Sequence, residues 1–234
     1  MPDLFKGGGL DMSVTPVPHE AASLAWGDCM VNRIAVIVVM ILFILEVADL
    51  IRLFPYLLRC MSRWKGNLEL EHSVSLARTR NTVSFVTALV LCLIVDCWIL
   101  DFPSFKTSLP VEWQLAYTGG LILGYVILRR LLYVIFPFRS RINEYDSCLQ
   151  HCVYNYQILL TCLMMVTVLP LAALKVPADI ARNILLIETA VFTALHFLRS
   201  GQIFSSRCSN LLAFLYLCAL EILPLGILYF ACTI

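Results

Sequence analysis

Six side chains that can carry charge fall inside long apolar stretches of the sequence or at their ends. These are Glu46, Asp49, Asp96, Glu188, His196 and Glu221. A charged group in hydrocarbon or in a protein interior is costly unless it is neutralised or paired. Two kinds of chemistry fit such a set. The groups could be stations of a proton or cation path, or they could be polar contacts that fix how helices pack.

Glu221 lies in the most apolar setting of the six. Within Leu211–Ile234 it is the only ionisable side chain other than Tyr and Cys. Pro224 follows three residues later, and because proline lacks a backbone N–H we expect the helix to loosen near residue 220. Glu221 is near the middle of this apolar stretch, so in a membrane-spanning helix it is predicted to face other helices rather than lipid.

The other acids allow plainer interpretations. Glu46, Asp49 and Arg52 are spaced by three residues, so a helix places them near one another. They could form a salt-bridged helix end whose charges reach water. Glu188 and Asp96 could equally be hydrogen-bonded contacts between helices.

No motif for a known kind of catalysis is present. The sequence contains no H-E-x-x-H, no G-x-S-x-G and no phosphate-binding loop. Cys148, His151 and Cys152 share one helical turn and could bind a metal in principle, but a fourth ligand is not evident nearby. Most of the ten cysteines lie in or beside apolar runs, where Cys behaves as a small hydrophobic residue. We therefore expect no catalytic residue, metal or cofactor, and no enzymatic activity.

The composition shows which elements must position these groups. Apolar residues make up 60% of the chain and charged residues 14%, and the mean hydropathy is +0.85. This exceeds the usual composition of a soluble domain and predicts an all-α integral membrane protein, a bundle of about six transmembrane helices in the lipid bilayer. A net charge of +1 argues against nucleic acid as a partner.

The predicted organisation is a flexible polar tail, residues 1–30, followed by a single transmembrane domain, residues 31–234. Residues 56–81 are expected to form a solvated loop with at most a short amphipathic piece. The six spans are predicted at about 31–51, 82–100, 113–136, 154–174, 181–198 and 211–233.

The third predicted span carries Ala116, Gly120 and Gly124 at steps of four residues. Small residues at this spacing form a stripe along a helix, on which another helix can approach closely. We expect this stripe to be a packing surface, either inside the chain or toward other membrane proteins.

The basic residues predict the orientation. Twelve of the 17 Lys and Arg residues fall on one side, in the connections after the first, third and fifth spans and, for Arg129 and Arg130, at the end of the third span. By the positive-inside rule those connections are cytoplasmic, so both termini are expected on the outer side of the membrane.

Two stretches carry a resemblance to a known family. They are LYLCALEILPLGILY, from Leu215 to Tyr229, and VYNYQILLTCLMMVTVLPLAAL, from Val153 to Leu174. Together they resemble a domain-of-unknown-function family of multi-spanning membrane proteins found in Bacteroidota, with Gly226 where a bulkier aliphatic residue is more familiar. The resemblance implies a six-helix body in the inner membrane of a Gram-negative bacterium, with periplasmic termini under the orientation above. It implies no activity.

Two functional hypotheses follow. The first is a non-enzymatic accessory or scaffold component, which joins other membrane proteins or a second copy through the Ala116/Gly120/Gly124 stripe and Glu221. It predicts that Glu221→Gln is tolerated and that Gly120→Leu disrupts assembly. The alternative is a small proton- or ion-coupled transporter, for which Glu221→Gln abolishes flux in a protein that remains folded.

Overall fold

The protein is helical throughout the part of the chain that the structure describes. The computed structural model describes residues 26–99, 109–135, 143–206 and 210–233, and these contain no strand. Six helices are long and apolar enough to cross a membrane. Because hydrocarbon offers no hydrogen-bond partners, a chain that crosses it satisfies its backbone groups within helices. The prediction of an all-α, six-span integral membrane protein is confirmed. The predicted tail lies mostly in residues 1–25, outside the described residues.

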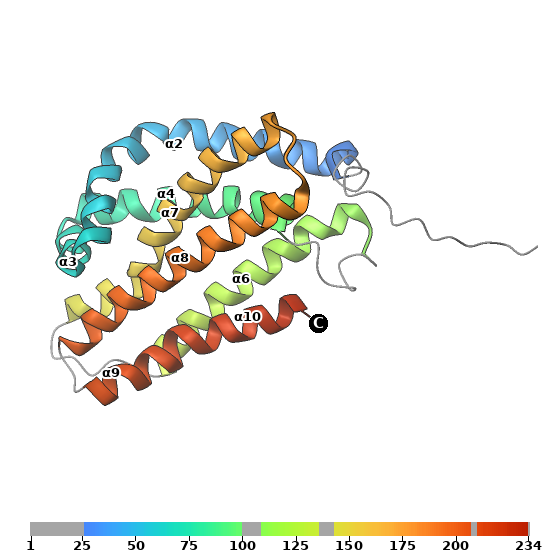
Figure 1. Cartoon of the computed structure of the whole chain (residues 1–234). Helices are drawn as coiled ribbons and strands as arrows, with labels where there is room; N and C mark the ends of the chain where they lie inside the picture. The colour runs from blue at the N-terminus through green and yellow to red at the C-terminus, as the bar shows by residue number, and fades with distance from the viewer. Residues whose placement is uncertain (1–25, 100–108, 136–142, 207–209, 234) are drawn as a thin grey trace, which may run out of the picture.

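The first three helices correct the predicted loop at residues 56–81. The first span, α2 (Met30–Ser62), continues through Pro55 and bends toward α3 (Trp64–His72) over its last turns (Figure 1). A bend is expected there because proline breaks one helical hydrogen bond. A further helix, α4 (Val74–Ile94), follows after one residue. The expectation of a solvated loop was wrong because these turns have apolar faces, on which Leu57 and Leu70 are almost completely buried.

The remaining helices keep the predicted order with different ends. The second span closes with a π-helical turn, η1 (Val95–Ile99), and α6 (Val111–Ile135) follows. Next come α7 (Asn143–Ala173) and α8 (Ala178–Ser205), each extending several residues beyond its predicted span. The last span is divided into α9 (Asn210–Leu217), a second π-helical turn η2 (Cys218–Ile222) and α10 (Leu223–Thr233).

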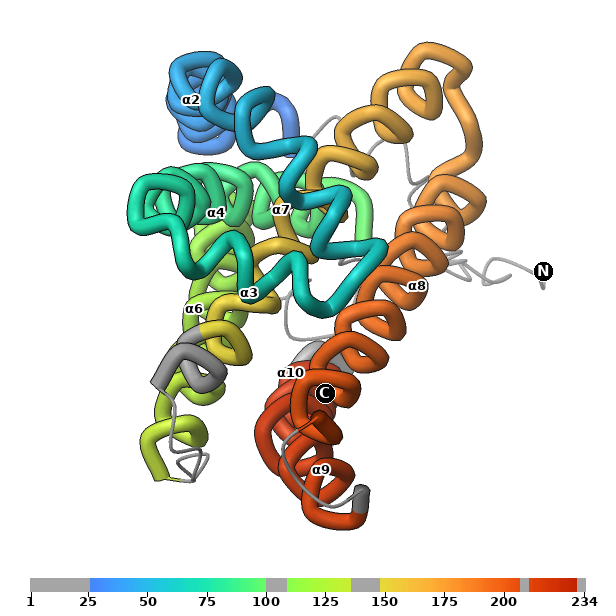
Figure 2. Tube along the Cα trace, turned by 90° about the vertical axis from the view of Figure 1, so that its left-hand side faces the viewer, coloured from blue at the N-terminus to red at the C-terminus, as the bar shows by residue number. Residues whose placement is uncertain are grey.

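The arrangement of the helices places α7 at the centre of the bundle. It packs against α2, α3 and α4 on one side and against α8 on the other (Figure 2). The last span packs against α8 and α6. The start of α2 and the end of α10 lie at one end of the bundle, while α3 and the end of α8 lie at the other (Figure 1).

Apolar side chains lie both inside and outside this bundle. The interior is made of three clusters of buried residues, with Leu149, Ile158 and Met164 of α7 completely buried. Large apolar side chains also cover the outside, for example Ile44 of α2, Val134 of α6 and Leu169 of α7. A soluble protein rarely exposes so much contiguous apolar surface, but a bilayer solvates it.

Candidate functional site

Glu221 is the centre of a buried charged network. Its side chain is completely buried, and the side chain of Arg129 opposite is 5% exposed. Arg129 donates from Nη2 to Oε1 at 2.7 Å and from Nε to Oε2 at 3.1 Å. Tyr133 donates its hydroxyl to Oε1 at 2.8 Å, and Nε2 of His196 lies 3.1 Å from Oε2. Two sequence-predicted residues, Glu221 and His196, thus meet in one site.

The carboxylate of Glu221 has no acceptor position left over. Two carboxylate oxygens offer about four lone-pair positions. Arg129 occupies two of them in a bidentate pair, and Tyr133 and His196 occupy the other two. Bidentate pairs of this kind are among the stronger hydrogen-bonded contacts in proteins. To take a proton or bind a substrate, Glu221 must therefore give up a partner that it already has.

Arg129 extends the network to a fourth segment of the chain. Its Nη1 donates to the carbonyl of Gln150 at 2.8 Å, and Nη2 lies 3.3 Å from the carbonyl of Leu149. The network consequently ties α6, α7, α8 and η2 together.

A π-helical turn presents Glu221 to its partners. In η2 the N–H of Leu223 donates to the carbonyl of Cys218, five residues earlier rather than four. Pro224 follows at once and cannot donate to the carbonyl of Leu220. The turn therefore lies where the sequence predicts a loosened helix, and it carries the acid of the network.

The space beside the network is small. A cavity of about 20 Å³ is lined by Arg129 and Tyr133 together with His151 and Tyr154. A cavity of this size has room for about one water molecule. It does not have room for a metabolite.

Asp96 forms a separate polar contact at the other end of the bundle. It lies in η1, is 4% exposed, and accepts from the hydroxyl of Thr118 on α6 at 2.6 Å. Trp26 donates its indole N–H to the same carboxylate at 2.7 Å. Each of the two π-helical turns in the described residues thus carries one buried acid.

The remaining predicted acids are not part of either cluster. Glu188 accepts from the hydroxyl of Thr167 at 3.3 Å, and it lies two turns of α8 away from His196. Glu46 is partly buried, and its Oε2 has no hydrogen-bond partner within the described part of the chain. The carboxylate of Asp49 is 3.7 Å from Arg52 and 44% exposed, as expected for a surface ion pair on a helix.

A second ionic cluster joins α3 to the helices behind it. Glu71 of α3 accepts from Arg80 at 2.7 Å, and its other oxygen lies 3.0 Å from Nδ1 of His151. Burial alone raises the pKa of Glu71, but the hydrogen bonds and charges of His151 and Arg80 outweigh it and lower the pKa from 4.5 to about 2. The ionised carboxylate therefore stabilises the fold.

This cluster predicts an acid-sensitive step in stability. Because the pKa of Glu71 is lower in the folded protein, its contribution is complete above about pH 4.5 and is lost as the pH falls toward about 2. We expect the thermal unfolding midpoint in detergent to fall over this range. In Glu71→Gln the free energy of unfolding near neutral pH should be lower by about 1.5–3 kcal/mol. The unfolding midpoint of this variant should therefore be lower and should depend less on pH.

Glu69→Gln is the matched control for this experiment, because Glu69 is an exposed acid on the same helix. An acid transition in Glu71→Gln identical to that of the wild type would contradict the assignment.

The possible metal ligands serve other roles. His151 binds Glu71, and Cys148 and Cys152 are almost completely buried on α7. The described residues contain no group of three His, Cys, Asp or Glu side chains placed to hold a metal ion.

The small-residue stripe faces away from the bundle. Ala116, Gly120 and Gly124 are all exposed on α6. A Cβ atom added at Gly120 or Gly124 meets no other atom within 4 Å. Within the described residues, this surface is not used to pack the chain against itself.

Sequence reasoning missed the positive half of the central network. The orientation argument places Arg129 and Arg80 among the cytoplasmic charges, but both residues are buried. Arg80 belongs to residues 56–81, and its burial was missed because that segment was expected to be a solvated loop. A signal for Arg129 was available, because six apolar or aromatic residues separate it and Arg130 from Pro137. An arginine that far inside an apolar run needs an acid opposite.

Comparison of this chain with protein-family models, with curated proteins and with solved structures finds no match. What the protein does must therefore be inferred from its own residues.

Proposed function

We propose that this multi-pass membrane protein is a non-enzymatic accessory or scaffold component of a membrane assembly. One observation carries the proposal: Arg129, Tyr133 and His196 together occupy both oxygens of Glu221 from within the chain. A catalytic or transporting acid needs an open position or a route to water, whereas this one is saturated. The network acts as a clamp that holds four segments in register.

The proposed assembly surface is the exposed Ala116/Gly120/Gly124 stripe. Glu221 is turned inward, so it is not available to another protein as the sequence suggested. The stripe lets the backbone of a neighbouring helix approach closely, with favourable van der Waals contact. Its partners are other membrane proteins or a second copy of this chain. Neither nucleic acid nor a cofactor has a place in this proposal.

Gly120→Leu is expected to separate assembly from folding. Gly120 is exposed and an added Cβ meets no atom within 4 Å, and leucine has the better helix propensity by about 0.8 kcal/mol, so the single chain should fold as well as the wild type. Close approach of a second helix should be blocked. Gentle purification from native membranes, followed by mass spectrometry, should recover a stoichiometric companion with the wild type and not with the variant.

Ala190→Leu provides the control for Gly120→Leu. It adds bulk at an exposed position of α8, away from the stripe. Recovery of the same companion with Gly120→Leu as with Ala190→Leu would refute the role of the stripe.

A second candidate function is proton- or ion-coupled transport. It is favoured by the two π-helical turns, each of which carries a buried acid, Asp96 or Glu221. Such turns are frequent at functional sites. A proton-sensitive dye in liposomes that contain the wild-type protein tests this candidate, since the scaffold proposal expects no flux above that of empty liposomes.

We place the protein in the inner membrane of a bacterium, with both termini in the periplasm. The support is the family resemblance and the distribution of basic residues. With Arg80 and Arg129 left out as buried, the remaining basic residues still favour the end of the bundle that carries α3.

A further inference from the structure

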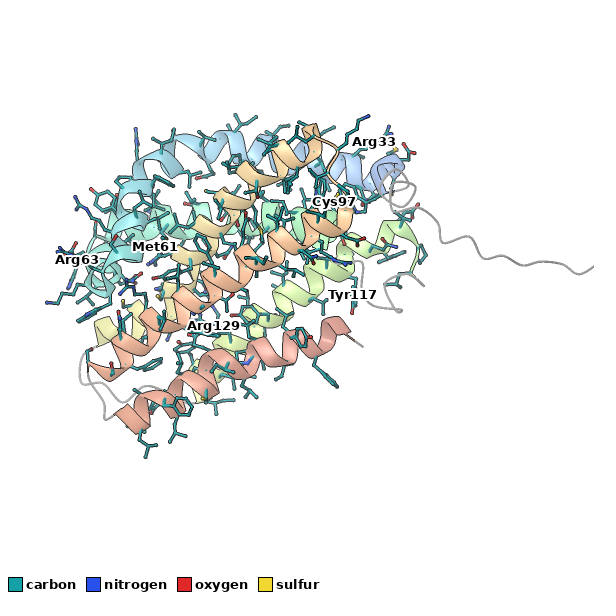
Figure 3. All side chains as sticks on the ribbon, in the orientation of Figure 1. Arg33, Met61, Arg63, Cys97, Tyr117 and Arg129 are labelled. Carbon is teal, nitrogen blue, oxygen red and sulfur yellow. The ribbon has the colours of Figure 1, made fainter. Side chains whose placement is uncertain are left out.

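A basic pocket lies at the end of the bundle that carries α3. It is largely open to the surroundings and has a volume of about 630 Å³. It lies where α2 ends, α3 begins and α8 ends, and Figure 3 shows Arg63 and Met61 at this end, far from Arg33. Its walls are made of Ser62, Arg63, Trp64, Lys65, Arg199, Gln202, Ser205 and Ser206.

The charges of the pocket have one sign. Arg63, Lys65 and Arg199 line it, and none of the described residues that line it is acidic. Arg199 is already engaged, because its guanidinium donates to the carbonyls of Met61 and Ser62 and to Gln202. It thereby satisfies the last carbonyls of α2 and attaches α8 to them.

Arg63 and Lys65 are left with their charges uncompensated. Both are exposed, and within the described part of the chain neither has an acidic partner. The ammonium group of Lys65 lies 5.8 Å from the ring centre of Trp64. The hydroxyls of Ser62, Ser205 and Ser206 already donate to carbonyls of their own helices. Within the described part of the chain, by contrast, no hydrogen bond is made by the cationic groups of Arg63 and Lys65.

The position of the pocket at the ends of two spans indicates that its ligand lies in the membrane. It opens where two spans end, beside a tryptophan, a residue that favours the level of the lipid headgroups. Under the orientation proposed above this is the cytoplasmic side, whose basic pockets between helices bind anionic headgroups. A phosphate group supplies the acceptor oxygens that a guanidinium and an ammonium group bind well.

We propose that this pocket binds the phosphate headgroup of an anionic phospholipid, held by Arg63 and Lys65. The proposal rests on the orientation proposed above, but it requires neither assembly nor transport. Arg199 is a positioning residue that holds the end of α2 in place.

The test compares unfolding temperatures in lipid nanodiscs made of phosphatidylcholine alone or of phosphatidylcholine mixed with phosphatidylglycerol. A ligand that binds only the folded protein stabilises it. We expect phosphatidylglycerol to raise the unfolding temperature of the wild type by several degrees and native mass spectrometry to detect the bound lipid. Both effects should be lost in Arg63→Gln/Lys65→Gln.

Arg59→Gln/Arg78→Gln is the matched control, because it removes two exposed charges at the same end that do not line the pocket. This control should keep the full rise. If the unfolding temperature of this control variant does not rise with phosphatidylglycerol either, general attraction between the basic surface of the protein and the anionic lipid explains the effect. Binding in the pocket would then not explain it.

Two further outcomes would overturn the proposal. One is a full rise retained in Arg63→Gln/Lys65→Gln. The other is an equal rise when inorganic phosphate is added to nanodiscs of phosphatidylcholine, which would assign the pocket to a soluble phosphate. Should the double variant unfold at a lower temperature than the wild type in phosphatidylcholine alone, Lys65→Gln by itself replaces it.

Discussion

Glu221→Gln is expected to destabilise the fold by about 3–5 kcal/mol, because it leaves the buried guanidinium of Arg129 without a counter-charge. Glutamine also has only one acceptor oxygen, so its amide NH₂ group meets one of the two donor pairs that the carboxylate accepted. The scaffold hypothesis, read from the sequence, expected this variant to be tolerated. The ion pair reverses that expectation.

The double variant Arg129→Gln/Glu221→Gln distinguishes the contribution of the two charges to stability from that of the other contacts in the network. Removing both charges together leaves none uncompensated, so most of the lost stability should return. Thermal unfolding of the two single variants and of the double variant in detergent measures the coupling. If the losses of the single variants simply add in the double variant, the ion pair does not hold the fold together.

Gly66→Ala is expected to cost about 1–3 kcal/mol, since its methyl group has no room. An added Cβ would lie 2.8 Å from the carbonyl oxygen of Arg59 and 3.0 Å from the backbone nitrogen of Cys60. These are backbone atoms of α2 and cannot rotate away, so α3 has to move. Its movement disturbs the hydrogen bond of 2.7 Å between the buried Asn67 and Asn155.

Gly201→Ala provides the comparison for Gly66→Ala. An added Cβ on α8 would have as its nearest neighbour a side-chain atom of Leu217 at 3.9 Å, an ordinary contact. Alanine also favours the helix, so this variant should be neutral or more stable by up to about 1 kcal/mol. Equal unfolding midpoints for the two variants would show that α3 does not require the close approach at Gly66.

The fold class was predictable because the hydropathy of a helix indicates directly whether water or hydrocarbon surrounds it. A run such as IAVIVVMILFIL in α2 is stable only in hydrocarbon or in a protein interior. The same measure failed for residues 56–81. It averages over all faces of a helix, and so does not show that Leu57 of α2 and Leu70 of α3 each lie on a buried face of their own helix.

The site was half predictable. That Glu221 needs protein around it follows from its depth alone, but its partner does not, because Arg129 precedes it by 92 residues and belongs to another helix. Pairing over such a distance depends on how the helices pack, and one sequence does not reveal this. The two π-helical turns were likewise hidden, although Pro224 indicated the position of one of them.

The small-residue stripe illustrates a different limit. The spacing of Ala116, Gly120 and Gly124 predicts a surface for close packing but not which helix will use it. The structure leaves the stripe on the outside, where Gly120 and Gly124 meet no atom of the chain. We propose that the helix that uses it belongs to another membrane protein or to a second copy of the chain.

The central claim is that the charges of Arg129 and Glu221 act inside the chain and that assembly takes place elsewhere. The most direct test is the mass of the native assembly formed by Arg129→Gln/Glu221→Gln after gentle purification. We predict the same companion and the same stoichiometry as for the wild type. A double variant that folds but no longer holds its companion would contradict the claim, because Glu221 or Arg129 would then act beyond the chain that buries them.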